Sequence, residues 1–161
     1  MSDNNQSLPI DKPRTLMLPP APYAAAIIGG WWLDRHVLSL TLDFGEITRP
    51  LGMLLIATGL ALMGWTFMEF SRHRTTVNPY AAATHLCNSG PFRYSRNPIY
   101  LGDWLILAGF SLWFTTLWPI LLSPLVWLIL RYGVIRHEEE HLEARFGQEY
   151  RSYKASVRRW L

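Results

Sequence analysis

The segment Gly90–Tyr100 combines a tight turn with side chains that can bind an anion. A Gly-Pro pair is followed by two arginines, an asparagine and two tyrosines, directly before an apolar stretch. Asn97 before Pro98 predicts a helix start, with Asn as the N-cap and proline at the first helical position. The free backbone N–H groups and the dipole of such a start favour an anion. Arg93 or Arg96 alone could equally anchor a helix at lipid headgroups, but the whole set predicts a binding site.

A second charged segment, Arg136–His141, contains three consecutive carboxylates at the end of an apolar stretch. Carboxylates at this place oppose the preference for cations at a helix C-terminus and the excess of Lys and Arg on the cytosolic side of membranes. A cation is therefore expected beside them. It is either an arginine of the chain (Arg136, Arg131 or the Arg96 region) or a cationic ligand.

The same segment matches the pattern H-E-x-x-H, in which His137 and His141 could bind zinc while Glu138 acts as a base. A catalytic zinc needs a third protein ligand, and the sequence supplies none at the expected spacing. We therefore predict no metal site. The one cysteine, Cys87, excludes an internal disulfide and a cysteine-based cluster.

The composition points to a membrane protein, because half of the residues are apolar and only 17% are charged, against about 25% in soluble domains. About 20 apolar helical residues cross a bilayer core. We predict an all-α membrane protein with a polar lead (1–21) and one domain (22–161) of about four transmembrane helices, at about 22–42, 51–70, 99–118 and 120–135. The last two form a helical hairpin, 71–98 is a cytosolic connection, and 136–160 is a cytosolic amphipathic C-terminal helix.

Polar and small residues inside these spans support further predictions. Asp103 interrupts the third span, and intramembrane acids are functional by default. Its alternative role is a hydrogen bond with Arg35 or Thr66. The charged triplet Asp34–His36 should lie near an interface or face the bundle interior. Close helix contacts are expected at the small residues of the second span: Gly52, Ala57, Gly59, Ala61 and Gly64.

The distribution of Lys and Arg predicts the orientation. They concentrate in the lead, the 71–98 connection and the C-terminal tail, and are few in the other connections. The positive-inside bias places both termini, the 71–98 connection and the candidate site in the cytosol. The basic pI has the same topological cause, so we expect no nucleic-acid partner. We expect an integral protein of a bacterial inner membrane, with the lipid bilayer as a partner and the oligomeric state open.

The ordered motifs resemble the isoprenylcysteine carboxyl methyltransferase-like family, which is related to the phospholipid N-methyltransferases. The resemblance covers roughly Pro50–Leu161, and in the eukaryotic enzymes the position of Asn97 is usually His. The motifs are Thr75-Thr76-Val77, the segment Gly90–Tyr100, Glu138-Glu139-x-x-Leu142, and Phe146-Gly147-x-Glu149-Tyr150-x-x-Tyr153.

This resemblance implies a methyltransferase that uses S-adenosyl-L-methionine, bound at the cytosolic ends of the last two spans. Arginine and asparagine suit its carboxylate, aromatic rings its sulfonium or adenine, and glutamates its amino group. The cofactor-binding residues are expected to be Gly90, Pro91, Tyr94, Arg96, Asn97, Pro98, Tyr100, Asp103 and Glu138, and the catalytic residues Arg136, Glu138 and Glu139. The acceptor is expected to be a lipid-like or amphiphilic small molecule. A prenyl-cysteine carboxylate, a phospholipid amine, a quinone-like hydroxyl and a small thiol all remain open.

Two other functions are compatible with the sequence. A membrane reductase of the sterol-reductase type has a similar C-terminal helical arrangement but uses NADPH. A membrane scaffold would use the basic tail to recruit anionic lipid. Binding of S-adenosylhomocysteine or of NADPH would separate these functions.

Overall fold

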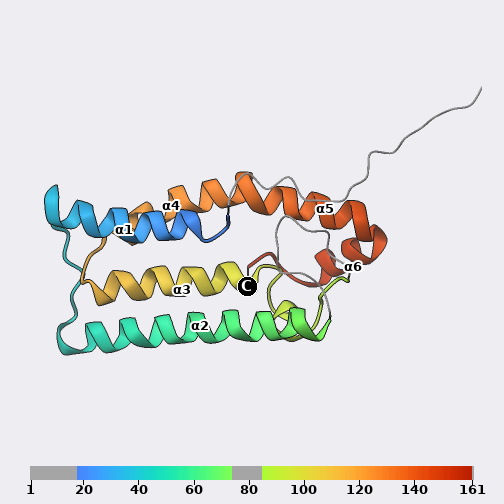
Figure 1. The fold of residues 1–161 in the computed structure, drawn as a ribbon, viewed down its shortest axis with the longest axis horizontal. Coiled ribbons are helices and arrows are strands. Elements are labelled where there is room, and N and C mark those ends of the chain that lie inside the picture. Colours follow the sequence, from blue (N-terminus) through green and yellow to red (C-terminus); the bar gives the residue numbers. More distant parts are fainter. Residues whose placement is uncertain (1–17, 74–84, 161) are drawn as a thin grey trace, which may run out of the picture.

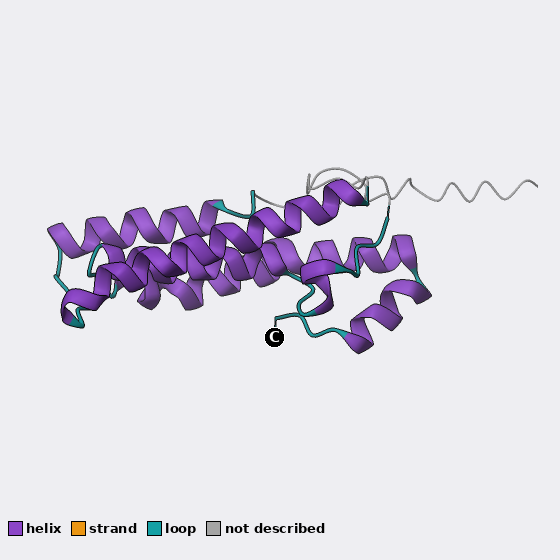
Figure 2. Cartoon of the chain, turned by 90° about the horizontal axis from the view of Figure 1, so that it is seen from below, coloured by secondary structure: helices purple, strands orange, loops and turns teal. Residues whose placement is uncertain are grey.

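All regular elements of the computed structural model are helices, within the residues 18–73 and 85–160 that the structure describes (Figure 2). The motif Thr75–Val77 and most of the predicted lead lie outside these residues. In chain order the elements are α1 (Ala21–His36), η1 (Gly45–Ile47), α2 (Thr48–Arg72), η2 (Gly90–Arg93), α3 (Pro98–Trp113), α4 (Trp118–Leu130), the π-helix η3 (Arg131–Ile135), α5 (Arg136–Phe146) and α6 (Gln148–Ser156). Helices α1 to α4 run along the long axis of the molecule, with α2 beside α3 and α1 beside α4 (Figure 1).

Two continuous helical stretches, Gly45–Arg72 and Trp118–Phe146, are long and apolar enough to cross a membrane. Only 17% and 33% of their most apolar windows are buried, so apolar side chains such as Leu60 and Leu125 face outward. Exposing such a surface to water costs about 25 cal/mol per Å² of apolar area, whereas a bilayer accepts it. These two helices support a membrane location.

The helices α1 and α3 have 16 residues each. At 1.5 Å per residue each is about 24 Å long, which is shorter than the ~30 Å hydrocarbon core. Two helices of spanning length therefore occur in the part of the chain that the structure describes, and four crossings remain an expectation.

The antiparallel helices α2 and α3 approach so closely that glycine backbones touch. A Cβ atom on Gly59 would lie 2.6 Å from the carbonyl oxygen of Gly102, and one on Gly52 would lie 2.8 Å from that of Gly109. A Cβ atom on Gly64 would have no neighbour within 4 Å. The close contacts predicted from the sequence are therefore present at Gly52 and Gly59 but absent at Gly64.

The last turn of α1, which contains Asp34, lies at the end of the bundle opposite α5 and α6 (Figure 1). The Asp34 carboxylate accepts hydrogen bonds from the Leu40 N–H and from the Thr116 hydroxyl, both at 2.9 Å. The backbone of Leu117 donates to Leu40 at 2.8 Å. These contacts tie the connection after α1 to the turn before α4, so Asp34 stabilises the fold at this end.

The C-terminal region departs from the single amphipathic helix predicted over 136–160. Gly147 adopts a φ of +52°, which glycine tolerates, and the chain turns there between α5 and α6. The turn lets α6 bury Tyr150 and Tyr153, and the Tyr153 hydroxyl donates to the Phe92 carbonyl at 2.8 Å. The burial of these two rings favours the turn over one continuous helix, so the prediction of a single helix over 136–160 was wrong.

Candidate functional site

The start of α3 and the end of the chain are joined by three hydrogen bonds. The Arg96 N–H donates to the Arg158 carbonyl at 3.0 Å. The Ser95 hydroxyl and the Asn97 side-chain amide donate to the Arg159 carbonyl at 3.1 Å and 3.0 Å. The helix start predicted at Pro98 is confirmed, but the Asn97 side chain makes no capping hydrogen bond. Asn97 instead fixes the C-terminal segment against the start of α3.

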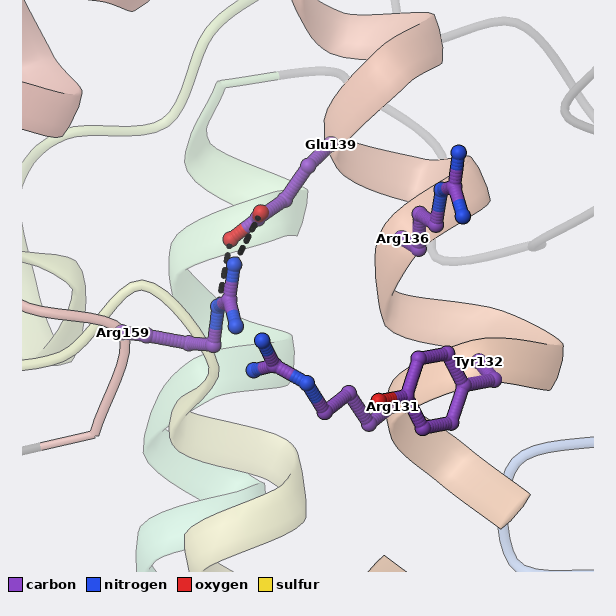
Figure 3. A pocket seen from close by; sticks show the side chains of 5 residues that line it. All are labelled: Arg131, Tyr132, Arg136, Glu139 and Arg159. Carbon is purple, nitrogen blue, oxygen red and sulfur yellow. Dashed lines mark hydrogen bonds and ion pairs between the residues drawn. The ribbon is translucent and has the colours of Figure 1, made fainter. Parts of the chain in front are cut away.

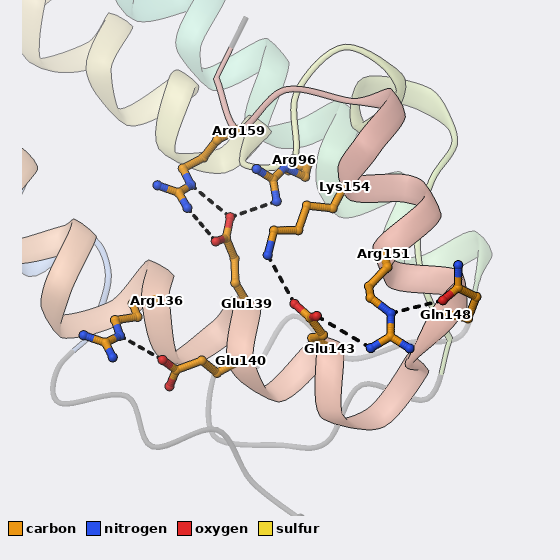
Figure 4. Close-up of polar contacts among 9 residues, drawn as sticks. All are labelled: Arg96, Arg136, Glu139, Glu140, Glu143, Gln148, Arg151, Lys154 and Arg159. Atoms are coloured by element: carbon orange, nitrogen blue, oxygen red, sulfur yellow. Dashed lines mark hydrogen bonds and ion pairs between the residues drawn. The ribbon is translucent and has the colours of Figure 1, made fainter.

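Glu139 is the centre of an ion-pair cluster (Figure 4). The Nε and Nη2 atoms of Arg159 donate to its two carboxylate oxygens at 2.9 Å and 2.7 Å. The Nη1 atom of Arg96 lies 3.1 Å from the same carboxylate, and the side chains of Arg96 and Glu139 are only 10% and 12% exposed. A pairing with Arg96 was one of the expected alternatives and is confirmed. Arg159 is a partner that the sequence did not indicate.

The neighbouring Glu140 is paired differently. It accepts a hydrogen bond from Arg136 Nε at 2.8 Å, and the two side chains are 59% and 67% exposed. This pair also matches one of the expected alternatives. An exposed pair of this kind contributes about 0–1 kcal/mol, because water and salt screen it.

Replacing Glu139 with glutamine is expected to lower the free energy of unfolding by roughly 2–3 kcal/mol, because Arg96 and Arg159 lose their shared counter-charge in a mostly buried setting. Glu140→Gln is the matched control and is expected to change it by less than about 1 kcal/mol. Thermal unfolding in detergent measures both variants. Equal midpoints for the two variants would show that the Glu139 cluster does not stabilise the fold.

Glu138 has a separate partner. The Tyr100 hydroxyl lies 3.0 Å and 2.9 Å from its two carboxylate oxygens and donates to them. Tyr100 is almost fully buried, and its carbonyl accepts a hydrogen bond from the Tyr23 hydroxyl at 3.3 Å. Residues of α1, α3 and α5 therefore meet at this point. A carboxylate has about four lone-pair sites, so Glu138 can accept further donors from a ligand.

Asp103 is buried one turn after Tyr100 in α3, and its Oδ2 atom has no hydrogen-bond partner among the described residues. The partners suggested by the sequence are engaged elsewhere. Arg35 lies over the Trp31 ring at 4.6 Å, and the Thr66 hydroxyl donates to the carbonyl of Leu62 at 2.8 Å. The alternative role of Asp103, a hydrogen bond with Arg35 or Thr66, is therefore not observed. A buried acceptor without a donor costs about 1–3 kcal/mol, which a donor from a ligand would offset.

Arg96 also has buried polar atoms that lack a hydrogen-bond partner. Its Nε and Nη1 atoms are buried without a correctly oriented acceptor among the described residues, although Nη1 is close enough to Glu139 for an ion pair. Arg96 can thus donate to a further carboxylate.

Gly90 lies against the carboxylate of Glu69, which is not among the predicted site residues. Gly90 has a φ of +56°, and a Cβ atom there would lie 2.9 Å from Glu69 Oε2. Glu69 is buried at the end of α2, where the Ser89 hydroxyl donates to it and His73 Nε2 lies 3.3 Å away. Its signal in the sequence was a single acid at the end of an apolar run. Pro91 is buried in η2, and its carbonyl accepts from the Tyr94 and Ser95 N–H groups at 3.1 Å and 3.3 Å, so Gly90 and Pro91 shape the loop.

Two other residues of this region do not join the Glu138 and Glu139 contacts. Tyr94 is 66% exposed. Cys87 is packed with Phe92, and burial followed by the charge of Glu69 raises the pKa of the Cys87 thiol to about 11. The thiol is therefore protonated at neutral pH, which agrees with a structural role.

A cavity of about 300 Å³ opens beside the Glu139 cluster (Figure 3). Three arginines and one glutamate give it a cationic lining, and no group of three potential metal ligands occurs in the described part of the chain. The cavity is lined by Arg131, Tyr132, Arg136, Glu139 and Arg159. Two of the predicted catalytic residues, Arg136 and Glu139, thus line one cavity, while Glu138 contacts Tyr100.

Comparison with known proteins places the chain in a family. Residues 47–149, more than half of the chain, match the family model described as phospholipid methyltransferase, and the chain belongs to this family. The match agrees with the resemblance found in the sequence and indicates a membrane methyltransferase. An uncharacterized protein of Haemophilus influenzae is 41% identical over 63 residues, which are 39% of this chain and 100% of that relative. No solved structure matches the chain significantly.

Proposed function

We propose that the protein is an integral membrane methyltransferase that uses S-adenosyl-L-methionine and acts on a lipid-like or amphiphilic acceptor. The family assignment supports methyl transfer, and the helices of spanning length support the membrane location. The observation that carries the cofactor assignment is the Tyr100–Glu138 pair one turn from the unpartnered carboxylate of Asp103.

The chemistry of the residues fits this cofactor. The methionine part carries an ammonium group, a carboxylate and a cationic sulfonium. Glu138 and Asp103 offer carboxylate oxygens for the cationic groups, and Arg96 has buried donors for the carboxylate. The site also joins the start of α3 to α5, and the resemblance to the family implies a cofactor in this region.

Bound in this site, S-adenosyl-L-methionine would supply a methyl group activated by the sulfonium charge. The residues of the chain then have to bind and orient the cofactor and the acceptor and exclude water from them. These are the main contributions to a transfer of this kind. Tyr100 orients Glu138, and Glu139 holds Arg96 and Arg159 in place. Arg136, which lines the cavity and pairs with Glu140, would steer the acceptor.

The proposed topology has four crossings, with the site and both termini facing the cytosol of a bacterial inner membrane. The cationic side chains of the C-terminal region support this orientation, because Lys and Arg concentrate on the cytosolic side. The bilayer is then the source of the acceptor.

Equilibrium binding in detergent tests the proposal against the reductase alternative. We expect S-adenosylhomocysteine to bind the purified protein and NADPH to give no signal, as measured by isothermal titration calorimetry. Binding of NADPH alone would contradict the proposal, and binding of neither ligand would favour a scaffold.

A further inference from the structure

The connection between α1 and α2, residues 37–47, exposes several large apolar side chains. It lies at the end of the bundle opposite α5 and α6, beside the turn between α3 and α4 (Figure 1). Apolar surface costs about 25 cal/mol per Å² when it faces water, and exposed apolar surface that is concentrated in one region marks a contact with a partner. Four side chains of the connection are exposed by 56% to 63%: Val37, Leu38, Phe44 and Ile47.

Polar groups of the same connection are bonded inside the protein. The Leu42 N–H donates to the Thr115 carbonyl at 3.1 Å, and the Phe44 N–H donates to the Thr48 hydroxyl at 2.7 Å. The Thr48 hydroxyl in turn donates to the Asp43 carboxylate at 2.7 Å. A connection in water can leave such groups to the solvent, whereas irregular backbone at membrane depth has to find its partners within the protein. The connection therefore meets the main requirement for contact with lipid.

Half of the eight tryptophans lie toward this end of the bundle. Trp31 and Trp32 are in the second half of α1, Trp113 is the last residue of α3, and Trp118 is the first residue of α4. The Trp118 indole N–H donates to the Leu38 carbonyl at 2.7 Å. Tryptophan is enriched where the hydrocarbon core meets the headgroups, because its ring is apolar and its N–H is polar. These tryptophans indicate that this end of the bundle lies at that boundary.

The length of α2 gives the same level for the connection. Arg49 and Arg72 flank its apolar stretch, and both side chains are exposed. At 1.5 Å per residue the two arginines are about 35 Å apart along the helix, slightly more than the ~30 Å hydrocarbon core. Ile47 is only two residues before Arg49. The connection therefore begins where α2 leaves the hydrocarbon core.

We infer that the 37–47 connection binds the lipid bilayer, with its apolar side chains inserted at the boundary between headgroups and acyl chains at this end of the bundle. The connection continues the lipid-facing surface of α2, and the bundle ends there instead of extending into water. Since Asp34 ties the connection to the turn before α4, the contact with lipid fixes the depth of the bundle in the membrane. The depth of the candidate site at the other end of α3 follows from it. The inference does not depend on methyl transfer.

Spin labels on the full-length protein in dioleoyl phosphatidylcholine vesicles test this inference. Each label is attached to one introduced cysteine. The native Cys87 is buried and its thiol is protonated at neutral pH, so it reacts slowly. Power saturation in electron paramagnetic resonance then compares collisions of the label with oxygen, which partitions into lipid, and with a nickel chelate, which stays in water. The labelled variants are Val37→Cys, Phe44→Cys, Leu60→Cys and Arg145→Cys.

Leu60 and Arg145 are the controls for lipid and for water. Leu60 is 57% exposed in the middle of α2, and Arg145 lies about 40 Å from Trp118 along one continuous helix. We expect oxygen collisions to exceed nickel collisions at Val37, Phe44 and Leu60, and the reverse at Arg145. Because the labelled side chains are exposed, the variants should keep the fold.

Two results would overturn the inference. The first is a frequency of nickel collisions at Val37 or Phe44 that equals the frequency at Arg145, because the connection would then lie in water. The second is a low frequency of collisions with both reagents at Val37 and Phe44, because another protein chain would then cover the connection. Ile47→Cys takes the place of either variant of the connection if that variant does not insert into vesicles.

Discussion

Replacing Glu138 with glutamine is expected to weaken binding of S-adenosylhomocysteine by about 10- to 100-fold, while the protein remains folded. The loss follows from removing a carboxylate that accepts a hydrogen bond from a cationic group of the ligand, since a charged hydrogen bond contributes about 1.5–3 kcal/mol. Folding should be little affected, because the glutamine oxygen can still accept from the Tyr100 hydroxyl. Calorimetric titration measures the affinity, and thermal unfolding without ligand reports on the fold.

Two variants separate a cofactor contact from a general loss of charge. Glu140→Gln removes the same charge two residues away, from an exposed pair with Arg136, and is expected to leave the affinity unchanged. Tyr100→Phe keeps Glu138 but removes the hydroxyl that orients it, so a smaller loss of affinity is expected. An unchanged affinity in Glu138→Gln would remove this residue from the site.

Replacing Gly59 with alanine is expected to lower the free energy of unfolding by about 1–3 kcal/mol, which is the usual cost of overpacking. The added Cβ would lie 2.6 Å from the Gly102 carbonyl oxygen and 2.8 Å from Ile106 Cγ1. Because one of these neighbours is backbone, α2 and α3 would have to move apart. Thermal unfolding in detergent measures the change.

Gly64→Ala is the control on the same helix, because its Cβ would meet nothing within 4 Å. Alanine also favours a helix over glycine by about 1 kcal/mol, and this gain applies to both variants. We therefore expect Gly64→Ala to be neutral or stabilising. If both variants unfold at the same temperature, α2 and α3 do not pack through their glycines.

The sequence predicted those parts of the fold that depend on local signals. The apolar run 51–70 predicted α2, and Asn97-Pro98 predicted the start of α3, because length, hydropathy and the fixed φ of proline act within a few residues. The first span was predicted to end at 42 but α1 ends at His36, the last residue of the charged triplet. The third span was predicted to end at 118 but α3 ends at Trp113.

The contacts that organise the candidate site were not predictable in this way, because they join distant segments. Asn97 binds the carbonyl of Arg159, which is 62 residues later in the chain. The choice between Arg96, Arg131 and Arg136 as partners of the glutamates depends on helix rotation, which η3 changes through a single wide turn. Likewise, Glu69 becomes part of the loop structure only because Gly90 packs against it.

The direct test of the central claim is transfer of a labelled methyl group from S-adenosyl-L-methionine in membranes that contain the protein. The matched sample contains the Glu138→Gln variant at the same level. We expect the label to appear in lipid-extractable product only with the wild-type protein. Equal labelling of the two samples, or no labelling together with no binding of S-adenosylhomocysteine, would contradict the assignment as a methyltransferase using this site.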